Sequence, residues 1–218
     1  MPRKKIEWKL QLIELLVIFI GISLAFFSEN LRESYKEKQL GKKFLQSFHN
    51  ELLEDRVVLE RTIEINSRKI NRADNFIQKI MTDEVVMDTL FLVISNIAQT
   101  NHSSTQTVTY ESIINSGNLD LITDFNLKEK IIKYYLFLET KKDQDKVYNE
   151  FLKDYMMPFV LNKMDLINQK LLDDNIYKEM SFRNMVISYR TLLNQELNND
   201  RIMLEMNEDL IVLFEATK

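Results

Sequence analysis

The sequence has no cysteine and very little glycine or proline. Without cysteine, disulfide frameworks and thiolate metal sites are excluded. The 218 residues include only three glycines and two prolines, several-fold fewer than average usage would supply. Sheet proteins need these residues in the turns between short strands. No proline lies between Arg3 and Met157, so long helices can continue without interruption. The sequence therefore predicts an all-α fold.

Histidine is also scarce, and no catalytic motif accompanies either of the two histidines. His49 lies in a predicted helix that has neither HExxH nor a second histidine four residues away. His102 lies in a polar segment beside Ser103 and Ser104, but no GxSxG elbow is present. The three glycines are too far apart for a phosphate-binding loop. We expect no enzyme activity, no metal site and no cofactor.

Acidic and aromatic side chains form the remaining candidate clusters. The acidic groups are Glu51/Glu54/Asp55, Asp173/Asp174 and Asp200/Glu205. A di-iron site in a helical bundle needs Glu-x-x-His on two helices, which is missing, so we interpret these acids as solvated helix faces. The aromatic set is Tyr134, Tyr135, Phe137, Tyr148, Phe151 and Tyr155. It is compatible with a ligand pocket, but core packing is the preferred interpretation.

A hydrophobic segment near the N-terminus predicts a membrane helix. Residues 15–27 contain no charged side chain, and the apolar zone extends back to Leu10 if Gln11 and Glu14 are tolerated. A helix of that length spans about 27 Å, against a hydrocarbon core about 30 Å thick. Trp8 and Lys9 stand where interfacial anchors belong. The predicted organisation is a basic tail (1–9), a transmembrane helix (10–28) and a soluble helical bundle domain (29–218).

Two alternatives to a membrane span stay open. Ser23 and Ala25 have the spacing of a signal-peptide cleavage site, although helix-forming sequence continues directly past them. A buried core helix is the other alternative, and a basic tail followed by Trp8 is unusual for one.

The charge distribution favours one orientation and excludes one class of partner. Residues 1–27 have a net charge of +2, whereas the rest of the chain has −6, out of a total of −4. The four basic residues among the first nine favour an N-terminus inside the cell and a body outside the cytoplasm. Nucleic-acid binding requires clustered basic side chains, so an acidic body predicts no nucleic-acid partner.

One face of the membrane helix predicts contact with another helix. Glu14, Gly21, Ala25 and Ser28 fall, with Gln11 and Ile18, within an arc of about 100°. The pair Gly21 and Ala25 is a small-xxx-small pattern that lets two helices approach closely. The hypothesis is a homo-oligomer or a partner membrane protein on this face. The alternative is that Glu14 extends to the lipid headgroups and that the small residues have no special role.

The body shows long helical periodicity. From Leu31 to Met81 the apolar residues recur at spacings of three, four and seven, and Gly41 is a candidate bend. This stripe comprises Leu45, Phe48, Leu52, Leu59, Ile63, Ile70, Ala73, Ile77 and Ile80. The opposite side is assigned to charged residues, namely Glu51, Glu54, Asp55, Glu60, Arg61 and Lys69. Such a helix must bury its stripe in a bundle or an antiparallel coiled coil.

The remaining segments complete a four-helix-like bundle. We expect a short apolar helix over 87–98, a polar loop over 99–108 and a short helix ended by Gly117 as a left-handed cap. Thr123 or Asp124 should cap a helix that ends at Pro158. An apolar helical segment over 160–171, a connection over 173–180 and a last helix capped by Ser181 should follow.

Two stretches resemble an uncharacterised family of small single-pass bacterial membrane proteins, a domain of unknown function. The first is ELLVIFIGISLA, with Glu14, Ile20, Gly21, Ile22 and Ala25 on the positions of the family pattern E-x-x-[L/V]-x-x-I-G-I-x-x-A. The second follows YExxxxSGNLxLI and comprises Tyr110, Glu111, Ser116, Gly117, Asn118, Leu119, Leu121 and Ile122. After Ala25 the sequence FFSENLRE departs from the family's Q-x-x-N-W-N-E. The resemblance implies a bacterial inner-membrane protein with one span. The family has no established activity, so the resemblance adds nothing about mechanism.

Two functions fit this sequence. The leading hypothesis is a membrane-anchored interaction or scaffold module that self-associates or binds a partner protein. The alternative is an extracytoplasmic sensor or ligand-binding bundle, with a pocket between its helices. A pocket larger than one aromatic ring would favour the alternative, and a closed core with an exposed apolar stripe would favour the interaction module.

Overall fold

The computed structural model describes residues 8–85, 91, 94 and 105–216. The helices are α1 (Trp8–Met81), α3 (Val108–Asn115), α4 (Phe125–Phe151), α5 (Met157–Lys163) and α6 (Met180–Ala216). Short 3₁₀ turns occupy Leu119–Leu121 and Ile176–Lys178, and one π-helical turn occupies Leu152–Met156. Two-residue strands, β1 (Met164–Asp165) and β2 (Lys170–Leu171), pair antiparallel. The predicted all-α fold is confirmed.

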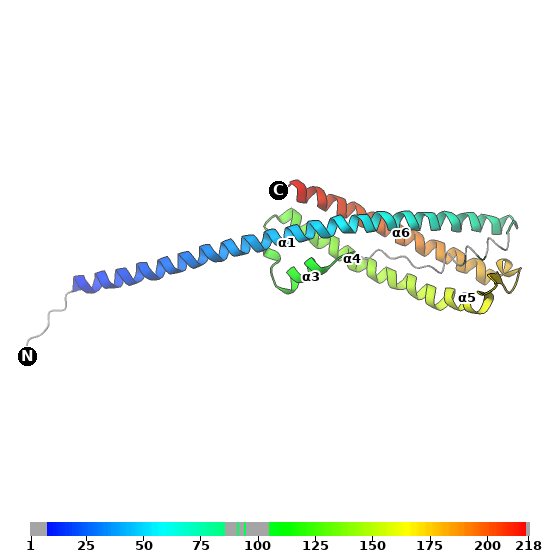
Figure 1. Cartoon of the computed structure of the whole chain (residues 1–218), viewed down its shortest axis with the longest axis horizontal. Helices are drawn as coiled ribbons and strands as arrows, with labels where there is room; N and C mark the ends of the chain where they lie inside the picture. The colour runs from blue at the N-terminus through cyan, green and yellow to red at the C-terminus, as the bar shows by residue number, and fades with distance from the viewer. Residues whose placement is uncertain (1–7, 86–90, 92–93, 95–104, 217–218) are drawn as a thin grey trace, which may run out of the picture.

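Helix α1 is a single continuous helix of 74 residues. At about 1.5 Å per residue it is about 110 Å long, and it extends far beyond the packed body (Figure 1). It passes through Gly41 without a break in the helix. Residues 10–28 and the start of the predicted soluble domain therefore belong to one helix, which connects the two parts rigidly.

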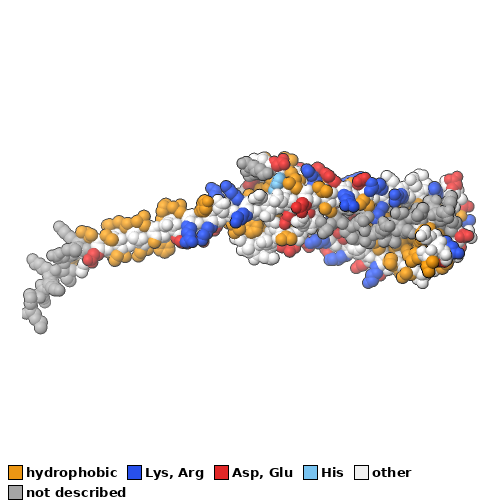
Figure 2. Space-filling view, viewed as in Figure 1, with side chains coloured by type: hydrophobic (Ala, Val, Ile, Leu, Met, Phe, Trp, Pro, Cys, Tyr) orange, Lys and Arg blue, Asp and Glu red, His pale blue; other side chains and the backbone are white. Residues whose placement is uncertain are grey.

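The first part of α1 has no packing partner in the described chain. Every side chain described between Gln11 and Leu40 is exposed, and burial begins at Gly41. Large apolar side chains surround the helix from Leu12 to Phe27, whereas charged side chains cover much of the bundle surface (Figure 2). This is the one described helix that is long and apolar enough to cross a membrane, and 0% of its apolar window is buried.

The rest of α1 forms one wall of a bundle with α4 and α6. Helix α6 packs against both of the other long helices, and α3 packs against α1 (Figure 1). Two apolar clusters fill the interior. The proximal cluster, nearer the exposed part of α1, includes Phe48, Leu52, Leu59, Ile113, Ile122, Leu127, Ile131, Tyr134, Tyr135, Leu138, Met203, Leu210, Ile211 and Phe214. The distal cluster includes Ile70, Ala73, Phe76, Ile80, Tyr148, Leu152, Met156, Val160, Phe182, Val186, Tyr189, Leu193 and Leu197.

The chain does not stop being helical at Pro158, contrary to the prediction. Helix α4 continues into the π-helical turn Leu152–Met156, and Pro158 is the second residue of α5. Proline lacks the N–H that an i→i−4 bond needs, so a regular α-helix cannot continue through it undisturbed. A π turn changes the hydrogen-bond register just before it. The proline therefore begins a helix instead of ending one.

The predicted helical segment over 160–171 is wrong after Lys163. Residues 164–171 form a small hairpin in which Met164 pairs with Leu171 and Asp165 pairs with Lys170. The Asp165 carboxylate accepts hydrogen bonds from the backbone N–H of Asn168 (3.0 Å) and from its side-chain amide (2.7 Å). This side-chain turn competes with the helix. The connection over 173–180 contains the second 3₁₀ turn, and α6 begins at Met180, so Ser181 lies one residue inside it.

Both other predicted caps are confirmed. Gly117 has φ 69°, and the N–H of Asn118 donates to the carbonyl of Ile113 (3.0 Å), as in a Schellman motif. The Asp124 carboxylate accepts from the N–H of Leu127 at 3.0 Å. The predictions for 87–98 and 99–108 fall mostly outside the described residues. Of that region, Phe91 and Ile94 are helical, and Ile94 is buried in the distal cluster.

Candidate functional sites

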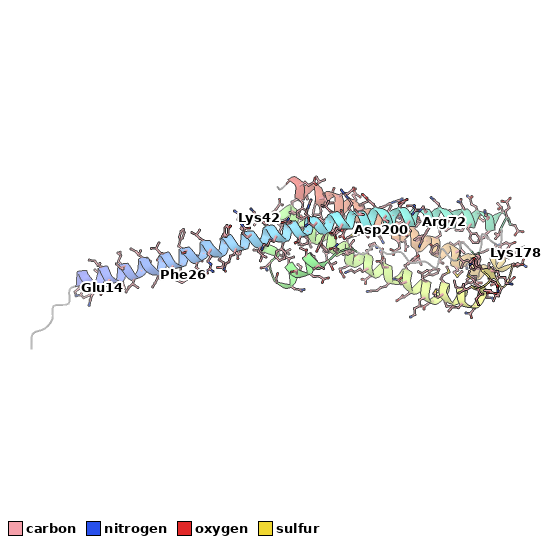
Figure 3. The ribbon with its side chains drawn as sticks, in the orientation of Figure 1. Glu14, Phe26, Lys42, Arg72, Lys178 and Asp200 are labelled. Atoms are coloured by element: carbon pink, nitrogen blue, oxygen red, sulfur yellow. The ribbon has the colours of Figure 1, made fainter. Side chains whose placement is uncertain are left out.

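The predicted helix-contact face lies on the exposed part of α1. Glu14, Gly21, Ala25 and Ser28 are all exposed, and Glu14 lies near the free end of the helix, far from the bundle (Figure 3). A Cβ built on Gly21 would meet no atom within 4 Å. The glycine is therefore not required by packing within the described chain. The face is open to a partner along its length.

The motif around residues 110–122 builds a structural clamp on α1. Glu111 accepts a 2.7 Å hydrogen bond from the hydroxyl of Thr107 at the start of α3. At the other end, Ser116, Gly117 and Asn118 form the left-handed turn, and the Asn118 amide donates to the Ser116 hydroxyl at 2.9 Å. Leu119 then packs against the proximal cluster. These residues shape a turn, and in this arrangement they have a packing role.

Tyr110 connects the clamp to the bundle. Its ring stacks on that of Tyr135, with centroids 4.1 Å apart and planes 9° from parallel. The preceding residue, Thr109, donates from its hydroxyl (2.6 Å) and its N–H (3.0 Å) to the Glu51 carboxylate on α1. The clamp is therefore held by one aromatic stack and one buried carboxylate.

Gly41 marks the place where the clamp meets α1. A Cβ at Gly41 would lie 2.9 Å from the carbonyl oxygen of Leu121, so only glycine lets the two backbones approach this closely. The glycine that was expected to bend α1 instead permits a helix-to-turn contact. This contact is where the exposed part of α1 becomes part of the bundle.

A second buried carboxylate, Asp55, lies one turn from Glu51. It is 1% exposed and accepts hydrogen bonds from the N–H of Gln106 (2.9 Å) and from the Tyr134 hydroxyl (3.3 Å). Burial raises the pKa of Asp55 from 3.8 to about 6 despite these hydrogen bonds. Burial likewise raises the pKa of Tyr134, so the phenol stays a donor. Asn207 on α6 completes the group with a bond to the Leu52 carbonyl (3.0 Å).

A charged layer separates the proximal and distal clusters. The Lys141 ammonium is 2% exposed and lies 3.2 Å from Asp145, 3.3 Å from Asp200 and 3.7 Å from Glu196. Burial lowers the pKa of Lys141, but the three carboxyl groups outweigh it and the pKa is raised. One cation cannot neutralise three carboxylates. Burial and the Asp145 carboxyl accordingly raise the pKa of Glu196 to about 8, so Glu196 keeps its proton at neutral pH.

The structure corrects the prediction that the charged side chains of the helices are solvated. Glu51, Asp55, Lys69 and Asp200 are buried, whereas they were assigned to solvated faces. The assignment holds for Glu54, Glu60, Arg61, Asp173, Asp174 and Glu205, which are exposed. The spacing of the apolar residues could have indicated this burial. Where two apolar residues of a stripe are seven positions apart, the position between them also faces the core. Asp55 fills the gap between Leu52 and Leu59, and Asp200 fills that between Leu197 and Leu204.

The aromatic set mostly fills the core, as the preferred interpretation stated. Tyr134, Tyr135 and Tyr148 are buried, and Phe137 and Phe151 are half-buried. Tyr155 differs, because it is 64% exposed. The buried and half-buried members of the set therefore pack between helices.

A pocket instead lies where α1 meets the start of α4 and the end of α6. Its volume is about 390 Å³, and it is lined by Lys42, Leu45, Gln46, His49, Asn50, Leu127 and Phe214. Lys42 lies where the bundle begins (Figure 3). The His49 ring meets that of Phe214 edge to face at 6.0 Å, and its Nε2 is buried without a hydrogen-bond partner within the described chain. Sequence reasoning missed this pocket because nothing in its residues forms a motif.

The described residues were also compared with the requirements of a metal site. Within residues 8–85, 91, 94 and 105–216, no group of three or more His, Asp and Glu side chains is placed to hold a metal ion. His102, Ser103 and Ser104 lie outside the described residues. Comparison with protein-family models, with curated proteins and with solved structures finds no match to the chain. Its function therefore has to be argued from these sites alone.

Proposed function

We propose that the protein is a membrane-anchored interaction module that binds and does not catalyse. Residues 10–28 cross a bacterial inner membrane once, and the bundle stands in the water beyond it. The observation that carries this proposal is the complete exposure of the apolar part of α1, from Leu12 to Phe27. Such a surface is stable in lipid and unstable in water.

The continuity of α1 supports a mechanical role for the anchor. The helix leaves the apolar part, crosses an exposed polar segment over 28–40 and enters the bundle at Gly41 without interruption. That polar segment is about 20 Å long. A rotation or tilt of the membrane part is therefore transmitted to the wall of the bundle.

The partner of the membrane part is a second copy of the chain or another membrane protein. The exposed face with Gly21 and Ala25 offers the close approach that such pairing requires. Glu14 on the same face gains a polar neighbour in a paired helix, which reduces the cost of placing it in lipid. The resemblance of residues 14–25 and 110–122 to single-pass proteins of unknown function supports this topology.

Disulfide cross-linking in native membranes tests the self-association. The natural chain has no cysteine, so Ser28→Cys on the face and Ser34→Cys on the opposite side of α1 are the only thiols in their variants. Oxidation should give a dimer with Ser28→Cys and little with Ser34→Cys. Adding Glu14→Leu with Gly21→Leu should abolish that dimer, whereas Ser23→Leu on the opposite face should preserve it. Equal cross-linking in all variants would contradict the proposed interface on this face.

The basic tail supports a body outside the cytoplasm. Four basic residues precede the membrane part within nine positions, and such residues are retained on the inner side. The acidic body carries no basic cluster that would suit a nucleic acid. The proposed surroundings of the bundle are therefore extracytoplasmic, and its proposed partners are lipid and protein.

A ligand-binding bundle is the second candidate. The specific observation that favours it is the pocket of about 390 Å³ beside His49, which lies within the usual size range of small-molecule sites. The pocket is separate from the aromatic helix faces and from the exposed face of α1. Binding there and pairing in the membrane are compatible, because α1 contributes to both sites.

A further inference from the structure

The pocket beside His49 has an apolar floor and a polar wall. Leu127 from α4 and Phe214 from α6 form the floor and are 2% and 5% exposed. The wall is one face of α1, where Lys42, Gln46 and His49 recur at helical spacing. An apolar surface with a few converging polar groups is the usual construction of a small-molecule site.

The polar wall combines three solvent-exposed side chains, Lys42, Gln46 and Asn50, with one buried nitrogen, the His49 Nε2. Within the described residues, Lys42 has no ion-pair partner and neither Gln46 nor Asn50 has a hydrogen-bond partner. His49 presents a buried Nε2 that is equally without a partner there. Farther along α1, by contrast, Glu51 accepts a hydrogen bond from Thr109, and Asp55 accepts one from Gln106. Buried polar atoms are normally paired, so the His49 Nε2 has unused hydrogen-bonding capacity, and the exposed Lys42, Gln46 and Asn50 side chains are accessible to a ligand.

The charges of the lining residues favour a negatively charged ligand. None of the seven lining residues is acidic, and Lys42 supplies a positive charge at the rim. Lysine, glutamine and asparagine side chains all donate hydrogen bonds, and a carboxylate accepts them through two oxygens. The floor offers only carbon surface, which favours an aromatic or aliphatic body.

We propose that this pocket binds a small organic carboxylate, with its apolar body on Leu127 and Phe214 and its carboxylate held by Lys42. The inference deepens the second candidate function and rests on it. It is independent of pairing in the membrane, because none of the lining residues belongs to the face with Gly21. Ligand contact with α1 at Lys42 occurs one residue beyond Gly41, where the exposed part of the helix joins the bundle.

A ¹⁹F NMR titration of the full chain in zwitterionic micelles tests the proposal. The probe is 4-(trifluoromethyl)benzoate, the neutral comparison is 4-(trifluoromethyl)benzamide, and empty micelles are the blank. The benzoate signal should broaden in proportion to added protein, and the benzamide should bind more weakly by about fivefold or more, since a charge-assisted hydrogen bond is lost. No protein-dependent broadening, or equal binding of the two probes, overturns the proposal.

Three variants locate the binding. Lys42→Met should weaken benzoate binding about fivefold, whereas Lys43→Met, an exposed neighbour that does not line the pocket, should leave it unchanged. Leu45→Trp should fill the pocket and abolish binding of both probes. Retained affinity in either Lys42→Met or Leu45→Trp would show that the probe binds elsewhere. Gly21→Leu should leave benzoate binding unchanged. Loss of dimer formation and loss of ligand binding can therefore be distinguished.

Discussion

The two parts of α1 differ in composition and in surroundings. Before Gly41 the helix is exposed throughout, with apolar side chains on every side as far as Phe27. After Gly41 its apolar side chains form one stripe, and Phe48, Leu52 and Leu59 are at most 2% exposed. An all-round apolar surface has no water-facing side and requires lipid, whereas a stripe requires other helices. Both the density of apolar residues and their arrangement around the helix therefore decide the environment of each part.

The largest expected difference comes from placing the same charge in each part. Leu59→Lys buries an unpaired ammonium in the proximal cluster and should unfold the bundle, because that desolvation costs several kcal/mol. Leu24→Lys should leave the bundle folded and weaken membrane integration by about 3 kcal/mol. Circular dichroism and alkaline extraction of membranes measure the two effects. A bundle that unfolds equally in both variants would contradict the distinction between the parts.

The buried part also depends on its charged layer. Lys141→Met removes the cation that three carboxyl groups share and should destabilise the bundle by about 3–5 kcal/mol, because a buried pair is broken. The matched control is Lys142→Met, whose side chain is exposed and pairs only with Glu139. That control should change stability by less than about 0.5 kcal/mol. Urea unfolding of the full chain in detergent measures both, and equal midpoints would refute the layer's role.

The layer should also make stability depend on pH. The folded pKa of Glu196 is about 8, above the ordinary value of 4.5, so its contribution is complete below pH 4.5 and is lost as pH rises towards 8. Glu196→Gln keeps the group neutral at every pH. The variant should match the natural chain at pH 4.5 and exceed it by about 2 kcal/mol at pH 8. A difference in stability that does not grow between these pH values would disprove the assignment.

The smallest expected effect compares the two glycines of α1. Gly41→Ala forces a methyl group against the Leu121 carbonyl and should destabilise the bundle by about 1–2 kcal/mol. Gly21→Ala meets no atom within 4 Å and should leave bundle stability unchanged. Both changes raise helix propensity equally, so the difference isolates the contact. Thermal unfolding should separate the two variants by several degrees. Identical curves would mean that the turn at Leu121 shifts away from residue 41 without cost, and would contradict the predicted contact.

The sequence predicted the helices better than their contacts. Scarcity of glycine and proline and the three-four-seven spacing were sufficient for the fold, since both act locally along the chain. Pro158 was misread because a π turn, which no pattern in the sequence indicated, places it at the start of α5. The hairpin at 164–171 was missed because Asp165 and Asn168 form a side-chain turn within an apolar segment.

The sites were harder to predict, because they depend on which residues meet across helices. Asp55 and Asp200 were taken as solvated, although each fills a seven-residue gap in its stripe. Their burial is tolerated because Tyr134, Gln106 and Lys141 come from other segments to meet them. The Gly117 turn was read correctly, since its geometry depends on one residue. The close contact at Gly41 was not foreseen, because its partner, Leu121, lies eighty residues away in the sequence.

The most direct test of the central claim is the accessibility of single cysteines in isolated membranes. Because the natural chain has no cysteine, Ser23→Cys and Ser34→Cys each carry one thiol, in the apolar part and in the polar segment of the same helix. A water-soluble maleimide should label Ser34→Cys at once and Ser23→Cys only after unfolding in detergent. Rapid labelling of both positions in intact membranes would place the apolar part of α1 in water and contradict the account.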